Sequence, residues 1–482
     1  MSCRERLARL RMLVLFACMP AVILALSFEI SATPTFARRY ETSCATCHQA
    51  WPRLNTTGES FRLNGFQFAD EERYRKSHPI EMGDEAYKRL WPNALWPSDV
   101  PRYSPLSIAM RNMGEFDADG SRPTRATYLL PEEVELVWVG NLGTDISFYG
   151  DVIFLQKDFG GAEPESWATI KGWVQFNDLF VENAFNVRVG TVGTQTIGLF
   201  TARDANYYGT HFYGYGNTLM PKVDPAAAGL ESFDGNPFLL TPQSGIEANG
   251  FGARWFYALG LANGNLNDPS SGPPDGDIVI FGMGNGGGSD TYLQLAWKIG
   301  GQALNQAAVE GDETLATAAE FWRDDSLILS LFAYKGSAVI EATDLEGVRT
   351  KTDDDFWRVA FGAQQQYKDV TLGVQYMIGK NDRPYGSLSP EPVDVRTYHV
   401  EALWFAKPWL IPFARYEAME FDVPDDVPGL AAEQDQSRWL AGAKAMVRPN
   451  VYLILETAIY DRGAELEEGV DGTIFSLLGV SF

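Results

Sequence analysis

From Ser104 to the C-terminus, apolar and polar residues alternate along the chain. Between Val370 and Ile378 every second residue is apolar, and the run from Val451 to Ile459 repeats this alternation. A period of two predicts β-strands with one apolar face and one mixed face. Similar segments bring the total to about 16 strands, each near the length that crosses a bilayer when tilted. Besides these two runs, the predicted strands lie at residues 106–116, 134–142, 146–157, 170–180, 185–194, 245–250, 253–263, 290–299, 325–336, 356–366, 396–406, 410–421, 437–447 and 470–482.

The connections between these strands alternate between short turns and long polar loops. The long loops are expected near residues 195–244, 264–289, 337–355, 380–395 and 422–436. This alternation is typical of outer-membrane barrels, whose short turns are periplasmic and whose long loops are external. Segment 300–323 departs from the pattern, because it is long where a short turn is expected, and we predict a helix from Thr314 to Trp322 within it.

The C-terminus adds a more specific signal. Ile474, Leu478, Val480 and the terminal Phe482 share one face of the last predicted strand. A final strand that ends in an aromatic residue is a familiar feature of bacterial outer-membrane barrels. We therefore predict an all-β fold for residues 104–482, an outer-membrane β-barrel of about 16 strands. A soluble β-sandwich or β-helix is the alternative.

Composition and charge narrow the possible partners. The chain has 63 Asp and Glu against 39 Lys and Arg, a net charge of −24, and 13% aromatic residues. Binding to nucleic acid depends on clustered Lys and Arg, so a nucleic-acid partner is not expected. We expect outer-membrane lipid to surround the barrel.

The N-terminal residues predict export. Basic residues, among them Arg4 and Arg11, precede an apolar run from Met12 to Phe28, and small residues follow at Ala32 and Ala37. This order is that of a secretory signal peptide, which we place at residues 1–37 with cleavage near Ala32 or Ala37. A retained membrane anchor and a lipoprotein are the alternatives. Removal of the signal peptide leaves only Cys44 and Cys47 in the exported chain.

Those two cysteines belong to the string Cys44-Ala45-Thr46-Cys47-His48. C-x-x-C-H is the attachment site of a c-type haem, in which both sulfurs form thioethers and the histidine binds the iron. A thioredoxin-like dithiol would need a βαβ pattern, and a zinc site would need a second pair of ligands, whereas a plain disulfide remains open. Residues 38–103 are then a small haem-binding plug with a proline-rich linker. Because so short a unit has little core of its own, the barrel is expected to supply walls for the haem.

The remaining haem contacts are left open by the sequence. Arg53 and Arg62 could pair with haem propionates, although solvated charges are an equal alternative, and His211 is expected to be a loop residue. Candidates for the sixth iron ligand are His78, Met82, Met113 and His399.

The N-terminal motifs also carry a resemblance. Together with the porin-like C-terminal domain, they resemble the fused monohaem cytochrome-porin family of iron-oxidising bacteria. The resemblance covers nearly the whole mature chain in architecture, but its sharp motifs lie within about residues 36–66. These motifs are Cys44-Ala-Thr-Cys47-His48, Pro52-x-Leu54, Gly58-x-x-Phe61 and Gly65 followed by an aromatic residue.

Membership of this family would imply an outer-membrane Fe(II) oxidase with one covalent haem c. Cys44 and Cys47 would form the thioethers and His48 would bind the iron, and no further catalytic residue is assigned. Fe(II) outside the cell would be the electron donor, and a periplasmic cytochrome c or cupredoxin would be the acceptor. Acidic clusters such as Asp353–Asp355 could attract Fe(II), although external loops of such proteins are often acidic in any case.

Two other functions remain open. The protein could be a transport porin whose haem is structural or a sensor, or a conduit that carries electrons outward to external acceptors. A single haem carries one electron at a time, which favours a one-electron donor such as Fe(II) over multi-electron reductions.

Overall fold

The computed structural model describes residues 35–51, 53–68, 71–76, 78, 80–81, 89, 92, 99–100, 102–117, 126–156, 169–192, 221, 223–234, 243–262, 279–280, 290–305, 320–430, 434–448, 450–462 and 473–481. The N-terminal elements are α2 (Thr35–Tyr40), η1 (Cys44–Thr46), β1 (His48–Ala50), β2 (Arg53–Leu54), α3 (Thr56–Leu63), α4 (Glu71–Tyr74), β3 (Ile80–Glu81) and β4 (Asp99–Val100). Among the residues described, no helix is both long enough and apolar enough to cross a membrane.

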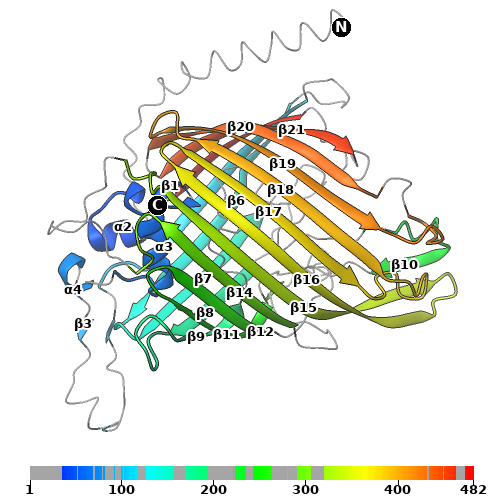
Figure 1. The fold of residues 1–482 in the computed structure, drawn as a ribbon, viewed down its shortest axis with the longest axis horizontal. Helices are drawn as coiled ribbons and strands as arrows, with labels where there is room; N and C mark the ends of the chain where they lie inside the picture. Colours follow the sequence, from blue (N-terminus) through cyan, green and yellow to red (C-terminus); the bar gives the residue numbers. More distant parts are fainter. Residues whose placement is uncertain are drawn as a thin grey trace, which may run out of the picture.

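A closed antiparallel β-barrel of 16 strands follows these elements, as predicted (Figure 1). The last strand pairs with the first, with Ser476 opposite Gly114, which closes the barrel. In chain order, which is also the order around the barrel, the strands are β5 (Leu106–Asp117), β6 (Ala126–Leu142), β7 (Ile146–Gln156), β8 (Thr169–Phe176), β9 (Asn186–Val192), β11 (Gln243–Phe251), β12 (Trp255–Ala262), β14 (Asp290–Gly300), β15 (Ser326–Asp344), β16 (Arg349–Tyr367), β17 (Val370–Asn381), β18 (Val393–Trp404), β19 (Leu410–Asp422), β20 (Gln436–Arg448), β21 (Val451–Arg462) and β22 (Thr473–Ser481). Two short strands, β10 (Leu230–Asp234) and β13 (Val279–Ile280), pair with β15 and β8.

The two ends of the barrel differ. At one end, which we call the turn end, β6 meets β7 through residues 143–145 and β16 meets β17 through residues 368–369. The first and last strands also begin and end there, and the N-terminal helices lie beside it (Figure 1). The opposite end, the loop end, carries the longer connections. By analogy with other barrels of this type, the turn end is expected to be periplasmic.

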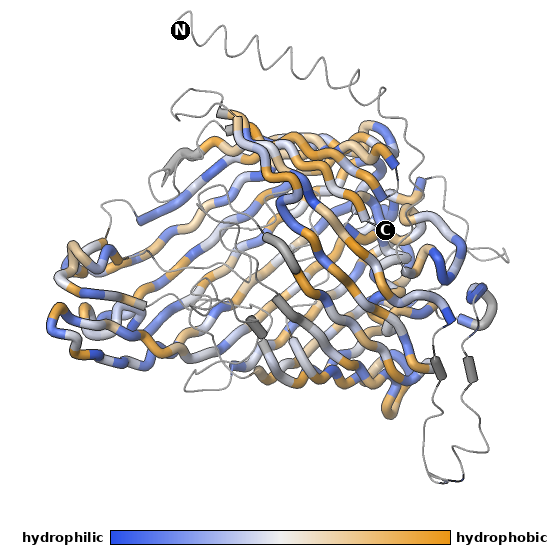
Figure 2. The backbone as a smooth tube through the Cα atoms, turned by 180° about the vertical axis from the view of Figure 1, so that it is seen from behind, coloured by the Kyte–Doolittle hydropathy of each residue, from blue (hydrophilic) through white to orange (hydrophobic). Residues whose placement is uncertain are grey.

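The alternation in the sequence places apolar residues on the outer face of the barrel and polar residues on its inner face. On β17, Leu372 and Val374 point outward and are about half exposed, whereas Thr371 and Gln375 point inward and are buried. Apolar and polar residues alternate along the tube in the same way on most strands (Figure 2). Exposed aromatic residues lie near both ends of the barrel, with Trp297, Tyr367 and Trp404 near the turn end and Tyr128 and Trp439 near the loop end. An apolar exterior with aromatic girdles is what a lipid environment requires.

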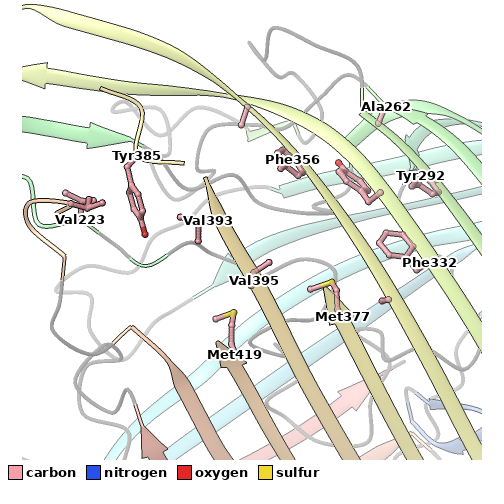
Figure 3. Packing of buried hydrophobic residues seen from close by; sticks show 14 of the residues in the cluster. Val223, Ala262, Tyr292, Phe332, Phe356, Met377, Tyr385, Val393, Val395 and Met419 are labelled. Carbon is pink, nitrogen blue, oxygen red and sulfur yellow. The ribbon is translucent and has the colours of Figure 1, made fainter. Parts of the chain in front are cut away.

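The inner wall also changes along the barrel axis. One buried apolar cluster reaches from the middle of the barrel to the loop end and includes Phe332 on β15, Met377 on β17 and Met419 on β19 (Figure 3). Loop residues join this cluster, because Val223 bridges to Leu430 and Asp224 donates its N–H to the Gly429 carbonyl at 2.8 Å. The turn half contains further apolar clusters, one of them with Ile411 and Ile454, together with buried charged residues such as Lys298 and Lys444.

The predicted long loop at 337–355 is wrong. β15 and β16 continue through this region to a tight turn at residues 345–348. The Asp344 carbonyl accepts the Gly347 N–H at 3.0 Å, and the Asp344 carboxylate accepts the N–H groups of Glu346 and Val348. Gly347 has φ +81°, which favours glycine. This turn chemistry ends the hairpin, and the polarity of residues 349–355 concealed a strand.

The helix predicted for Thr314–Trp322 lies largely outside the described residues. Its last residues, 320–322, form a turn, in which Arg323 donates its N–H to the Glu320 carbonyl. The Trp322 indole stacks on Phe405 and donates to the Asp369 carboxylate at 2.9 Å. The long connection between β14 and β15 therefore has a packing role at the turn end.

The N-terminal segment, residues 35–68, is bonded to strands on all sides of the barrel. Six contacts define its seat, and each joins it to a different strand. They are Thr35 to Ser107 on β5 (3.0 Å), the Gly65 carbonyl to Ser147 on β7 (2.7 Å), Thr56 to Lys298 on β14 (2.8 Å), Gln49 to Gln366 on β16 (3.0 Å), Arg53 to Glu401 on β18 (3.0 Å) and the Trp51 carbonyl to Lys444 on β20. Because these six strands are spread around the circumference of the barrel, the segment sits across its turn-end mouth.

Candidate haem-attachment site

The cysteines and the histidine of the motif lie on one short turn. η1 begins at Cys44 after Ser43, whose side chain accepts the Ala45 N–H at 3.3 Å. Cys47 donates its N–H to the Cys44 carbonyl at 3.2 Å, and β1 begins directly afterwards at His48. The two cysteines are not joined by a disulfide. Both thiols and the imidazole therefore come from five consecutive residues with a fixed backbone.

Asn55 and Gly58 brace this turn from the next helix. The Asn55 amide donates to the Thr46 carbonyl at 3.1 Å, while its oxygen accepts the Gly58 N–H at 2.9 Å as the N-cap of α3. A Cβ at Gly58 would lie 2.1 Å from the Cys47 carbonyl oxygen. Only glycine allows α3 to approach the motif this closely, which gives a physical reason for its place in the motif pattern.

Aromatic rings pack beside the thiols. Tyr40, Phe61, Phe68 and Tyr74 form a buried cluster, and Cys47 packs against it. Burial raises the pKa of the Cys44 thiol to about 11 and that of Cys47 to about 12. Both thiols are therefore neutral near pH 7 when no group is attached to them.

A buried carboxylate that sequence reasoning missed organises the same unit. Glu71 accepts the Tyr40 hydroxyl at 2.8 Å and the Phe68 N–H at 3.1 Å, and it pairs with Arg39 and Arg75. Residues 70–76 contain several charged side chains. Nothing local distinguishes Glu71 from the neighbouring charges, because its partners lie up to 32 residues away.

The donor set fits a covalently attached haem. The motif offers two unbridged thiols and, at His48, a partly exposed imidazole that packs 4.7 Å from the Trp51 ring. Among the residues that the structure describes, the inner wall also contains buried polar atoms without hydrogen-bond partners, Gln375 Nε2 and Oε1 among them. These are features that a group with polar edges could satisfy.

The candidates for the sixth ligand are scattered. His78 is exposed, whereas Met113 and His399 are buried on the inner faces of β5 and β18, and Met82 and His211 lie outside the described residues. His399 faces Glu417, with 3.9 Å between Nδ1 and Oε1. Within the described part of the chain, no three His, Cys, Asp or Glu side chains gather as a metal site.

The arginines and the acidic cluster have other partners. Arg53 pairs with Glu401 and donates to Gln364, and Arg62 pairs with Glu59 at 2.7 Å. The Asp353–Asp355 cluster lies within β16 rather than in a loop, and Asp354 accepts from Asn381 and from the Arg383 N–H. Asp354 therefore has a structural role, which removes it from a cluster that could attract cations.

Comparisons with known proteins identify no family for this chain. No protein-family model matches the chain, and no curated protein is similar to it in sequence. Among solved structures, OmpF of Salmonella typhi in complex with daunomycin is 10% identical with a TM-score of 0.46, over 78% of this chain and 96% of that one. The outer membrane channel DcaP of Acinetobacter baumannii is 11% identical with a TM-score of 0.45, over 78% and 96%. OmpT of Vibrio cholerae in its trimer form is 14% identical with a TM-score of 0.43, over 78% and 98%. Because these identities and TM-scores are low, the architecture is assigned from the strand pairing of the chain itself.

Proposed function

We propose that this protein is an outer-membrane barrel that holds one covalent haem c in its turn-end mouth and transfers electrons between the outside and the periplasm. The observation that carries the proposal is the seat of the C-x-x-C-H segment, which is bonded to strands all round the barrel. Because the barrel itself would hold the haem, electron transfer would require no separate membrane-spanning protein.

The exterior and interior of the barrel both support this proposal. Exposed apolar residues and aromatic girdles suit outer-membrane lipid as the surroundings. Inside, charged side chains such as Lys298, Glu417 and Lys444 are at most 1% exposed. A porin that passes hydrated solutes keeps such groups in water, so the burial of these three side chains favours electrons over solutes as the species transferred.

The residues of the motif would have separate roles. When bound, the haem would supply a one-electron redox couple. Cys44 and Cys47 would attach it, His48 would bind its iron, and Asn55 and Gly58 would hold the backbone of the turn. The aromatic cluster around Cys47 would exclude water from the attachment site.

The direction of transfer comes from the family resemblance. We propose Fe(II) as the external donor and a periplasmic cytochrome c or cupredoxin as the acceptor. The test is spectroelectrochemistry of the purified protein. The oxidised haem should be reduced by Fe(II), and the reduced haem should pass its electron to a small c-type cytochrome. If Fe(II) leaves the haem oxidised while a low-potential donor reduces it, transfer runs outward.

A channel is the second candidate, and the architecture favours it directly. Barrels of about 16 strands are wide enough to enclose an aqueous pathway. In that case the N-terminal segment would regulate a pore, and any haem would be structural or a sensor. Liposome swelling with small sugars separates the two functions, because a channel would swell the liposomes and a plugged barrel would not.

A further inference from the structure

Gly65 and Phe66 form a turn that has no role in the function proposed above. Both residues have left-handed backbones, with φ +65° and +59°. The Phe66 N–H donates to the Phe61 carbonyl at 2.9 Å and so closes the end of α3. Gly65 must be a glycine, since a Cβ there would lie 2.3 Å from the Ser147 hydroxyl oxygen. Phe66 has a Cβ, and backbone strain of this kind persists only where surrounding contacts compensate it.

The contact that compensates this strain is made with the barrel wall. The Phe66 ring stacks on Phe36 of α2, with 5.3 Å between the ring centres, and on Trp173 of β8, with 5.7 Å and an angle of 17°. Trp173 points inward and is 9% exposed, whereas the next residue, Val174, is 41% exposed on the outer face. The Phe66 ring therefore joins the N-terminal segment to the inner wall.

Neighbouring strands hold the Trp173 ring in place. Tyr149 on β7 stacks on it, with 5.9 Å between the ring centres. The Arg188 guanidinium on β9 lies 4.2 Å from the centre of the same ring and pairs with Glu247 on β11 at 3.1 Å. Trp173 therefore offers Phe66 a surface that is fixed by the barrel, which is what precise positioning of a site requires.

The same stack leads to the attachment turn. Phe36 contacts Phe61 edge to face, with 4.7 Å between the ring centres. Phe36, Phe66 and Cys47 all pack against the aromatic cluster to which Phe61 belongs. A displacement of the Phe66 ring would therefore loosen the packing around Cys47.

We propose that Phe66 and Trp173 are positioning residues for the cofactor. Their stack fixes the attachment turn against the inner wall and keeps water away from it. This rests on the proposed function, because a bound haem is what gives the position of the turn a chemical consequence. The potential of a redox centre depends on its exposure to water, and water stabilises the more highly charged ferric state. Loss of the stack should therefore lower the midpoint potential.

The first test measures this potential in the full-length, haem-loaded protein. Trp173→Leu removes the ring from the wall, and Phe66→Asn removes the ring from the segment but keeps the turn, because asparagine tolerates a left-handed backbone. Both variants should lower the midpoint potential. The double variant should lower it no further than the stronger single one, since both remove the same contact. Trp173→Phe retains a ring and should restore most of the wild-type potential.

Phe356 offers a matched control. It is a buried aromatic residue on β16, 2% exposed, that stacks on Tyr334 with 5.8 Å between the ring centres. Among the residues described, its apolar cluster includes none from the segment 35–68. Any general effect of removing a ring from the inner wall should therefore appear in Phe356→Leu, whose potential should match that of the wild type.

The second test needs no haem. In haem-free full-length chain at one fixed pH, iodoacetamide should label Cys47 several-fold faster in Trp173→Leu and Phe66→Asn than in the wild type or Phe356→Leu, because the looser packing exposes the thiol. Peptide mass spectrometry distinguishes Cys47 from Cys44, and heat-modifiability shows that each barrel has assembled. Should Trp173→Leu fail to assemble, Phe66→Asn decides, since it changes no barrel strand.

A wild-type potential in assembled, haem-loaded Trp173→Leu would overturn the positioning role and leave the proposed function intact. Absence of covalent haem from the wild-type protein would instead refute the proposed function. The labelling of Cys47 then decides alone whether the stack positions the turn, and an unchanged rate in both variants would overturn it.

Discussion

At the scale of single residues, the backbone around the motif is specified by steric and polar contacts. A methyl group at Gly58 would overlap the Cys47 carbonyl oxygen, at 2.1 Å from it. Overpacking of this kind typically costs about 1–3 kcal/mol, because the backbone must move. Here the part that must move carries the attachment cysteines.

Gly58→Ala should therefore lower haem incorporation as well as stability. Haem stain per chain on denaturing gels measures the first, and thermal unfolding measures the second. Gly172→Ala on β8 is the control, since its Cβ would lie 3.3 Å from the nearest atom. Equal haem incorporation in the two variants would show that the Gly58 contact does not position the motif.

The cysteines give a test with a pH signature. Burial holds their pKa values at about 11 and about 12, above the ordinary value of 9.0. Neutral thiols thus stabilise a haem-free fold below about pH 9, and this contribution is lost as the pH rises through 11 to 12. In the haem-loaded protein no thiol titrates, so this loss of stability at alkaline pH should be absent.

Thiol labelling checks the same point directly. Folded haem-free chain should react slowly with iodoacetamide at pH 8 and rapidly once unfolded, because the thiolate is the reactive form. Chain with thioether-bound haem should not react even when unfolded, and Cys44→Ala with Cys47→Ala should abolish haem stain. Two reactive thiols in the unfolded native protein would exclude covalent attachment.

The buried ion pair between Arg53 and Glu401 makes a third residue-level prediction. Their side chains are 9% and 3% exposed, and removal of one partner leaves a buried charge, which typically costs about 3–5 kcal/mol. Arg53→Leu should therefore make the N-terminal segment sensitive to protease while the barrel stays heat-modifiable. Adding Glu401→Leu should restore part of the protection, and a double variant as sensitive as the single one would argue against this pair as an anchor.

At the scale of elements, α2 bears on the processing of the chain. Of the two cleavage positions that the sequence allows, Ala37 lies inside this helix. Thr35 is 1% exposed and bonds through its N–H and hydroxyl to Ser107, so its loss would remove a contact to β5. We therefore expect the mature chain to start close after Ala32, which N-terminal sequencing of the purified protein can check. A mature chain that begins at Arg38 would contradict this.

Strands were predictable from sequence to different degrees. The lipid-facing alternation marked all 16 barrel strands, because every second residue must be apolar on the outside. The β15–β16 hairpin was missed beyond residue 336, since its outer part carries Asp and Lys residues and its turn depends on Asp344 and Gly347. The individual contacts of the N-terminal segment with the wall could not be predicted, because they join distant residues, in half of the six contacts more than 300 positions apart, as in Gln49 with Gln366.

At the scale of the whole molecule, the barrel and the N-terminal segment depend on each other. The segment has one aromatic cluster of its own and takes several of its polar partners from the wall, while the wall has inward charges that the segment satisfies. Lys298 pairs with Asp324 at 2.6 Å and also donates to Thr56, and Lys444 donates to the Trp51 carbonyl. Removal of the segment would leave these lysines facing an open mouth.

Deletion of residues 38–103 should therefore open the turn-end mouth, so that the blocked barrel becomes a conducting one. The strands themselves should still close, because β22 pairs with β5 independently of the segment, so the variant should remain heat-modifiable and reach the outer membrane. In planar bilayers we expect small or absent conductance for the full-length protein and larger, stable steps for the deletion variant. Arg53→Leu, which loosens the seat without removing the segment, should give rare, brief openings. If the full-length protein conducts as well as the deletion variant, the segment does not close the mouth, and the channel becomes the better account of the protein's function.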